Sequence, residues 1–151
     1  MEIQSVMKRQ VVSVHEDATL EKAVALLVEH RIGMLPVVDR EGKLLGIVRL
    51  KNILELSLPT FVEVMEDYDF VHDFGAMEIG EISQEKRGTP VREIMQPPQA
   101  VEMSCRLLRA HAFMRQHDLH DLPVVDDRGI LVGLASWVDV GVGFLKDWIR
   151  S

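Results

Sequence analysis

A serine and an aspartate three residues apart, Ser136 and Asp139, have the spacing of groups that could hold a small polar ligand. They follow an apolar run containing Gly133 and stand at the start of a pattern typical of a helix. Backbone N–H groups are unpaired where a helix begins, so a hydroxyl beside them suits a phosphate. A carboxylate in the first turn can accept hydrogen bonds from both hydroxyls of a ribose, and a glycine lets a ligand approach the backbone. The alternative interpretation is that Ser136 caps the helix and Asp139 complements its dipole.

The elements that would position these residues occur twice in the chain. Residues 35–39 read Leu-Pro-Val-Val-Asp and return as residues 122–126, an offset of 87. Apolar, glycine and histidine positions match at the same offset, and upstream the offset becomes 88, so residues 6–7 correspond to 94–95. The chain is therefore predicted to contain two copies of one structural unit.

Each copy reads as strand, helix, strand, turn, strand and helix. Strands are expected over 11–14, 35–38 and 44–48 in the first copy and at the matching places in the second, starting with 100–103. The closing helices are expected over 50–56 and from 137 to about 148. Asp17 or Thr19 can cap the first helix, and Ser104 can cap its counterpart. A unit of about 55 residues is too small to be comfortably stable alone, so the copies should pack together.

The predicted fold class is α/β (α+β), with two βαββα repeats related by pseudo-two-fold symmetry. The continuous apolar runs of both hairpins suggest sheets that are covered on both faces, by helices on one side and by the sister repeat on the other. The sheets would then face each other, and two equivalent clefts would lie between the halves.

The repeat resembles the CBS domain, which carries an apolar-Pro-Val-Val-Asp strand, a glycine-containing turn and a Gly-apolar-apolar-Thr/Ser-x-x-Asp ending. Both copies show the first two features, residues 133–139 match the ending, and the likeness covers about 6–56 and 91–145. The resemblance implies a regulatory tandem pair that binds AMP, ADP, ATP or S-adenosylmethionine between its repeats. We expect a first CBS repeat over 1–57, a partly helical acidic insert over 58–88 and a second CBS repeat over 89–151.

The resemblance also assigns ligand-binding roles in the second repeat. It gives Ser136, Asp139 and Gly133 the roles argued above from their chemistry. The adenine would be held by backbone and apolar contacts of a second group of residues, namely Ala100, Leu119, His120, Asp121 and Pro123.

The first copy departs from the motif at its ending, where Arg49 replaces the hydroxyl residue and Asn52 replaces the carboxylate. Asn52 can still meet a ribose hydroxyl through its amide oxygen, without the charge that strengthens such a bond. Arg49 could instead reach a phosphate of the ligand. We predict one competent site in the second repeat and a weaker or empty one in the first.

Composition excludes several classes of protein. The net charge of −7 argues against nucleic-acid binding, which needs clustered Lys and Arg. No apolar run approaches the roughly 20 residues that span a bilayer, and residues 1–10 lack the features of a signal peptide, so a cytoplasmic protein is expected. The single cysteine, Cys105, excludes an internal disulfide and reads as a small packed residue.

Residues 58–88 hold eight carboxylates against Lys86 and Arg87. They also hold four aromatic residues, Phe61, Tyr68, Phe70 and Phe74. We expect a helix from about 60 to 65, aromatic side chains that anchor the insert, and a mobile stretch over 75–88. The alternatives to a solvated acidic face are a docking surface and a divalent-cation site built from Glu66, Asp67, Asp69 and Asp73.

Two other kinds of site are weighed and disfavoured. Three histidines and two aspartates lie close together in sequence, namely His111, His117, His120, Asp118 and Asp121. Because His117 matches His30 at a helix end, the helix dipole explains it better than a metal does. His120 is the exception, since it falls in the stretch assigned to the adenine. No set of residues with family context predicts nucleophilic catalysis, so we expect no enzyme.

The leading hypothesis is an adenosine-ligand sensor that works as a homodimer and alters the behaviour of a protein target. The first alternative is a structural dimerisation and partner-docking module with empty clefts. The second is a divalent-metal-responsive regulator that acts through the acidic insert.

Overall fold

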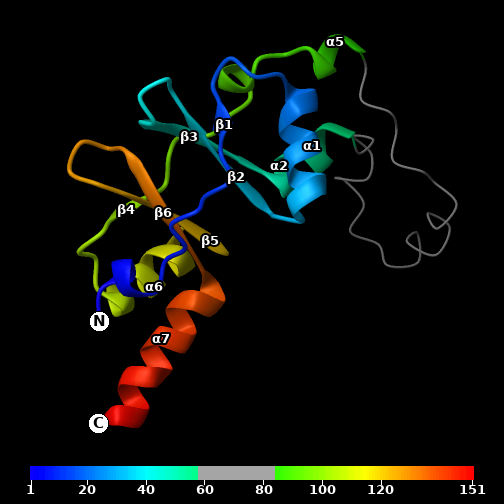
Figure 1. Cartoon of the computed structure of the whole chain (residues 1–151). Coiled ribbons are helices and arrows are strands. Elements are labelled where there is room, and N and C mark those ends of the chain that lie inside the picture. The colour runs from blue at the N-terminus through cyan, green and yellow to red at the C-terminus, as the bar shows by residue number, and fades with distance from the viewer. Residues whose placement is uncertain (58–83) are drawn as a thin grey trace, which may run out of the picture.

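The computed structural model describes residues 1–57 and 84–151, shown in colour in Figure 1. The expectations for the insert, its helix over 60–65, its aromatic anchor and its four cation ligands, lie outside the described residues.

The two copies have the same order of elements. The first contains β1 (Val14–His15), α1 (Leu20–His30), β2 (Met34–Val38), β3 (Leu44–Arg49) and α2 (Leu50–Ser57). The second contains β4 (Val101–Glu102), α6 (Leu107–Gln116), β5 (Asp121–Val125), β6 (Leu131–Ser136) and α7 (Trp137–Arg150). Two short 3-10 turns, η1 (Ile3–Ser5) and η3 (Val91–Glu93), precede the copies, and the small helix α5 (Gln84–Arg87) precedes η3. The predicted pair of βαββα repeats is confirmed.

Each repeat contains a three-stranded sheet of order β1-β2-β3 or β4-β5-β6. The first pair of strands in each sheet is parallel and the second is antiparallel, so the two sheets have one topology. Strands β1 and β4 are two residues long, shorter than predicted, because only those residues pair with β2 and β5. The helices α1 and α2 lie at one end of the molecule, and α6 and α7 lie at the other (Figure 1).

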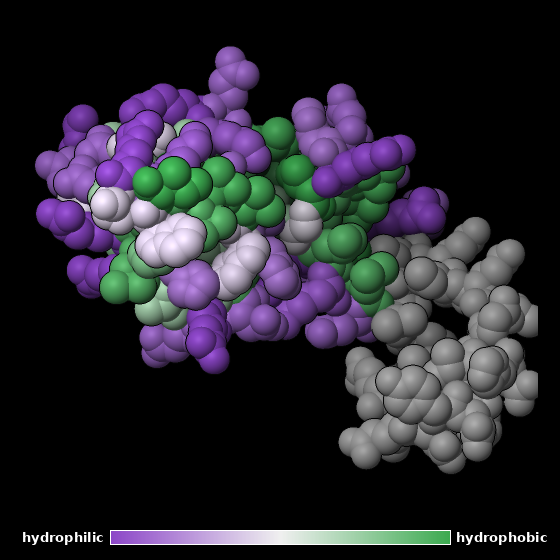
Figure 2. All heavy atoms as spheres, turned by 90° about the horizontal axis from the view of Figure 1, so that it is seen from below, coloured by the Kyte–Doolittle hydropathy of each residue, from purple (hydrophilic) through white to green (hydrophobic). Residues whose placement is uncertain are grey.

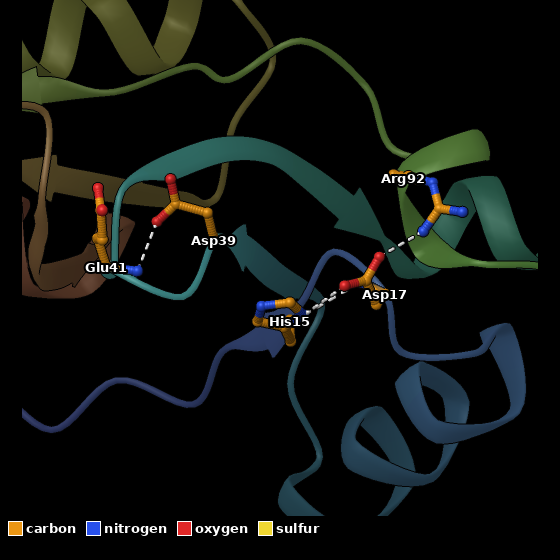
Figure 3. Close-up of polar contacts among 5 residues, drawn as sticks. All are labelled: His15, Asp17, Asp39, Glu41 and Arg92. Atoms are coloured by element: carbon orange, nitrogen blue, oxygen red, sulfur yellow. Dashed lines mark hydrogen bonds and ion pairs between the residues drawn. The ribbon is translucent and has the colours of Figure 1, made fainter.

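The two hairpin turns are equivalent and contact each other. Asp39 accepts hydrogen bonds from the backbone N–H of Glu41 and of Lys43, both at 2.9 Å, and Figure 3 shows the first of these. Gly42 and Gly129 adopt positive φ angles of 84° and 80°, which a side chain would strain. The N–H of Leu44 donates to the Gly129 carbonyl at 3.0 Å, and the reciprocal bond from Leu131 to Gly42 is also 3.0 Å. This exchange is what pseudo-two-fold symmetry requires.

The segment that leads into each repeat packs on the other repeat. Lys8 and Leu134 exchange two backbone hydrogen bonds of 2.8 and 2.9 Å, and Ile47 and Gln96 exchange two of 3.0 and 2.9 Å. In the same way, Arg92 of η3 forms an ion pair with Asp17 at 2.5 Å, beside His15 (Figure 3). The two halves are therefore joined by exchanged segments as well as by their hairpins.

The hydrophobic core is also shared between the two halves. Ile3 from the lead segment is fully buried in the cluster built around α6 and β5, and Val91 is fully buried in the cluster built around α1 and β2. Met34 and Ile47 of the first repeat belong to the core cluster of the second. Because each cluster contains residues of both halves, neither repeat has a complete core alone.

The predicted caps are confirmed in one copy only. Thr19 caps α1 by accepting a hydrogen bond from the N–H of Lys22 at 3.2 Å. The expectation that Ser104 caps α6 is wrong, since Arg106 stands at the N-cap and forms no side-chain cap bond. The N–H of Leu107 donates instead to the carbonyl of Met1 at 3.1 Å, so the exchanged lead segment takes over part of the capping.

Within the two described ranges, no helix combines the length and the hydrophobicity needed to cross a bilayer. The longest helix, α7, projects away from the sheets toward the C-terminus (Figure 1).

Candidate functional site

The junction between β6 and α7 carries the two polar residues singled out from the sequence. Ser136 ends the strand and caps the helix by accepting a hydrogen bond from the N–H of Asp139 at 3.0 Å. The carboxylate of Asp139 accepts in return from the N–H of Ser136 at 2.9 Å. The N–H of Trp137 donates to the His120 carbonyl at 2.8 Å. The expectation of unpaired amides beside the hydroxyl is therefore wrong for these three N–H groups, which have partners within the protein.

A residue that the sequence did not single out, Lys8, completes this junction. Its side-chain nitrogen lies 3.5 Å from Oδ2 of Asp139, and its side chain is 67% exposed while that of Asp139 is 22% exposed. Lys8 reaches this place because its backbone pairs with Leu134 two residues before the end of β6. The offset of 88 residues aligns Lys8 with Gln96. No local sequence pattern, however, tells on which of the two repeats the segment around Lys8 packs.

A second carboxylate, Asp121, begins β5 directly opposite Ser136 in the antiparallel ladder. Side chains of directly opposed residues lie on the same face of a sheet. Burial raises the pKa of Asp121 above its ordinary value, the charges of Lys8 and His120 lower it, and the charge of Asp139 raises it further. The carboxylate of Asp121 is thus close enough to Lys8, His120 and Asp139 to feel their charges at the N-terminus of α7.

The other residues expected to hold the adenine are divided among different environments. Leu119 and Pro123 are buried in the core, whereas His120 is exposed and contributes its carbonyl to the junction. Ala100 lines a separate cavity of about 700 Å³, together with Arg106 and Arg109. The structure therefore brings Asp121 and the His120 carbonyl to the junction of Ser136 and Asp139, and it places Ala100 at the cavity beside Arg106 and Arg109.

The lead segment of the chain packs closely against Gly133. A Cβ atom at this position would lie 2.3 Å from Sδ of Met7 and 3.1 Å from the carbonyl oxygen of Lys8. The absence of a side chain at this position thus lets the lead segment approach the strand closely. Gly46 has the same role in the first repeat, where a Cβ would lie 2.6 Å from the carbonyl oxygen of Gln96.

The corresponding junction of the first repeat faces a cavity of about 380 Å³, lined by Arg49, Asn52 and Gln96 among others. The amide oxygen of Asn52 is buried and has no hydrogen-bond partner among the residues that the structure describes. Arg49 donates to the backbone carbonyl of Asp118 in the second repeat, at 2.5 Å. The guanidinium group expected to reach a ligand phosphate thus contacts the turn between α6 and β5.

Two other potentially reactive side chains, Cys105 and His117, pack against neighbouring residues. Cys105 is a buried free thiol, and burial raises its pKa while the charge of Arg109 lowers it. His117 follows α6 as its C-cap and packs its ring 4.4 Å from that of Phe113, between centroids. Across residues 1–57 and 84–151, no three His, Cys, Asp or Glu side chains are arranged to hold a metal ion.

Comparison with known families finds one match that covers both repeats. The model of the CBS domain matches residues 3–59 and 91–140.

Individual relatives match the chain at modest identity. An uncharacterised protein of Methanocaldococcus jannaschii (MJ1404) is 30% identical over 91% of this chain, which spans only 30% of that relative's length. Another protein of the same organism (MJ1426) is 29% identical, with 93% of this chain and 89% of the relative covered. The crystal structure of CBSX2 in complex with AMP, a CBS-pair protein of Arabidopsis thaliana, is 25% identical with a TM-score of 0.72, and 99% of this chain and 98% of that one are covered.

Proposed function

The chain belongs to the CBS-domain family, and from this premise we propose that it is a non-catalytic regulatory module that binds an adenosine-containing ligand in the cleft of its second repeat. The observation that carries the proposal is the junction of β6 and α7, where Ser136 and Asp139 stand in the family's ending. The complex of CBSX2 with AMP supports this choice of ligand class.

In the proposed site, Asp139 receives the ribose. Its Oδ2 is occupied by the N–H of Ser136 and by Lys8, and a carboxylate has further lone pairs for two sugar hydroxyls. The proposed contacts also include the other expected residues of the second repeat, Ser136, Gly133, Ala100, Leu119, His120, Asp121 and Pro123. Arg49 and Asn52 form the weaker site of the first repeat.

Signalling would follow from a ligand that binds two conformations of the pair with different affinity. Arg49 and Lys51 both contact Asp118 across the halves, Lys51 at 3.9 Å, so these contacts can report a change in the clefts. We further propose that the protein acts as a cytoplasmic homodimer on a protein target. The division at residues 57 and 88 stays a prediction.

Isothermal titration with AMP, ATP and S-adenosylmethionine tests the proposal. At least one ligand should bind the native protein, and Asp139→Ala should weaken that binding by about tenfold or more, because a ribose held by a carboxylate loses charge-assisted bonds. The matched variant Asn52→Ala, at the same place in the first repeat, should keep the main site. No binding by any of the three ligands, or binding that survives Asp139→Ala unchanged, would contradict the proposal.

A structural dimerisation module is the second candidate, and one observation favours it. The capping box and the Lys8 pair already satisfy the polar groups of the junction without a ligand. This candidate predicts a dimer that captures its partner equally well after Ser136→Ala combined with Asp139→Ala, with no heat from any adenosine ligand.

A further inference from the structure

We propose that the cavity between β4 and α6 is a second ligand site, which binds a small phosphate ester with an apolar organic part. The volume of this cavity, about 700 Å³, is within the range of small-molecule sites. Of the described residues that line it, only Ala100 is among those expected to hold the adenosine ligand. The site therefore does not rest on the proposed adenosine-sensing function.

Two arginines supply the positive charge of this cavity. Arg106 and Arg109 both line it, and neither forms an ion pair with another residue of the described ranges. The hydroxyl residue Ser104 lines it too, and Glu102 is the one acidic residue among the described lining residues. Guanidinium groups bind phosphate through charge-assisted and often bidentate hydrogen bonds. Because the whole chain has a net charge of −7, this attraction for an anion is a local property of the cavity.

The places of the two arginines on α6 are unfavourable without an anion. The helix begins at Leu107, so Arg106 is its N-cap and Arg109 lies in its first turn. The helix dipole disfavours cations there, and a guanidinium group cannot accept the hydrogen bond that a capping side chain accepts. The N–H of Leu107 already donates to the Met1 carbonyl, so we assign the phosphate to the guanidinium groups and not to the helix backbone. Sequence choices that break a local rule in this way are expected at functional sites.

The first repeat satisfies the equivalent place with its own residues. At the offset of 87, Thr19 stands at the place of Arg106, and Asp17 stands at the place of Ser104. Thr19 caps α1, and the carboxylate of Asp17 pairs with Arg92 at 2.5 Å (Figure 3). The second repeat has arginine in place of the cap and serine in place of this carboxylate. A bound phosphate would supply the negative charge that Asp17 supplies in the first repeat.

The apolar residues of the cavity indicate the organic part of the ligand. Leu108 and Phe113 line it from the same helix as the arginines, and Leu108 is 66% exposed. Small-molecule sites typically combine apolar walls with a few polar groups that orient the ligand. A phosphate held by the arginines would leave these two side chains to contact an apolar ring or chain.

The test titrates the full chain with phenyl phosphate and with inorganic phosphate, followed by two-dimensional ¹H–¹⁵N NMR. Phenyl phosphate should shift the amide signals of residues 104–109 most, and it should bind at least about threefold tighter than inorganic phosphate because its ring is buried. Arg106→Gln combined with Arg109→Gln should weaken the binding of phenyl phosphate by at least about tenfold. Arg115→Gln is the matched control, since it removes the same charge in the last turn of α6 and should bind as the native protein does.

Two further measurements separate a lost site from a lost fold. The double arginine variant should melt at the native temperature or above it without phosphate, because it removes cations from the start of a helix. Leu108→Ala should weaken the binding of phenyl phosphate and leave that of inorganic phosphate unchanged.

Three results would overturn the proposal. They are no saturable binding of phenyl phosphate, shifts centred on the junction of β6 and α7, and equal binding by the native protein and the double arginine variant. Each of them would leave the adenosine-sensing function standing. Conversely, a protein that binds phenyl phosphate at α6 but no adenosine ligand would retain this site and lose the proposed function.

Discussion

The side-chain nitrogen of Lys8 lies 3.5 Å from a carboxylate oxygen of Asp139, which joins the lead segment of the chain to its last helix. The backbone of Lys8 is fixed by Leu134, so its side chain can release Asp139 without loss of the segment's own hydrogen bonds. A ligand that takes the Asp139 carboxylate would change the pairing of Lys8. Ligand binding at Asp139, as proposed, would in this way be coupled to the segment that leads into the first repeat.

The helix caps give a matched pair of predictions. Ser136→Ala and Thr19→Ala each remove a hydroxyl that accepts a bond from the third residue of a helix, at 3.0 and 3.2 Å. Each variant should lose about 1 kcal/mol of free energy of unfolding, measured by urea denaturation. Ser104→Ala is the control and should lose little, because Ser104 forms no cap. A Ser136→Ala protein as stable as the native one would show that the capping box does not form.

Alanine substitutions of Gly46 and Gly133, the two glycines that contact the lead segments, should destabilise the protein to different extents. In Gly46→Ala the new methyl group would lie 2.6 Å from the backbone carbonyl oxygen of Gln96, which is held in a reciprocal pair of hydrogen bonds. In Gly133→Ala the closest atoms belong to the Met7 side chain, which can move. We expect a loss of about 1–3 kcal/mol for Gly46→Ala and a smaller one for Gly133→Ala.

The control for these glycine variants is Gly33→Ala. No atom lies within 4 Å of a Cβ built at Gly33, so this variant should be neutral or slightly stabilising. If all three variants lost the same free energy of unfolding in thermal denaturation, the close packing of the lead segments on Gly46 and Gly133 would not be the cause of the destabilisation.

The pH dependence of stability should report the surroundings of Asp121. Burial raises its pKa above the ordinary value of 3.8, so the folded protein binds this proton more tightly than the unfolded chain does. The group therefore favours the folded state at low pH, and this contribution is lost as the pH rises through the raised pKa. Asp121→Asn stays neutral, so it should unfold at a higher temperature than the native protein at pH 7. The difference should shrink toward pH 4, whereas Asp127→Asn should follow the native curve throughout.

Much of the fold is predictable because short sequence patterns, present in both repeats, specify the strands, turns and helices. The Leu-Pro-Val-Val-Asp strand, the Asp-to-Gly turn and the 87-residue offset led to the correct order of elements in both copies. The exchange of lead segments was not predictable, since the hydrogen bonds of Lys8 with Leu134 join residues more than a hundred positions apart and leave no periodic signal.

The exchanged lead segment also explains two local features that the sequence did not predict. Met7 occupies the space beside Gly133, and Met1 supplies the carbonyl that replaces a Ser104 cap. Sequence spacing identified Ser136 and Asp139 as partners but could not tell whether they bind each other or a ligand. That choice depends on the backbone geometry at the start of α7, where both bonds form.

The exposed apolar face of α7 leads to the last prediction, on the proposed homodimer. Five of its residues are among the most exposed large apolar side chains, namely Val138, Phe144, Leu145, Trp148 and Ile149, at 47–76%. A groove of about 340 Å³ runs beside them between α6 and α7, and the face in Figure 2 has an apolar area bordered by hydrophilic side chains. The first repeat has a similar groove of about 390 Å³, lined by Val28 and Leu50. A contiguous set of exposed apolar side chains of this kind usually marks an interface, and a second copy offers a matching pair of faces.

Sedimentation velocity should therefore find the native protein as a dimer, and Leu145→Glu should weaken the dimer by at least about tenfold, because the variant would bury an unpaired carboxylate among apolar side chains. Lys146→Glu is the matched control. It introduces the same side chain one residue further along α7, about 100° around the helix and away from the apolar face, so it should leave the dimer intact. If both variants sediment as the native protein does, α7 lies outside the interface; if the native protein is a monomer at all concentrations, the apolar face serves another partner, and the dimer proposal fails.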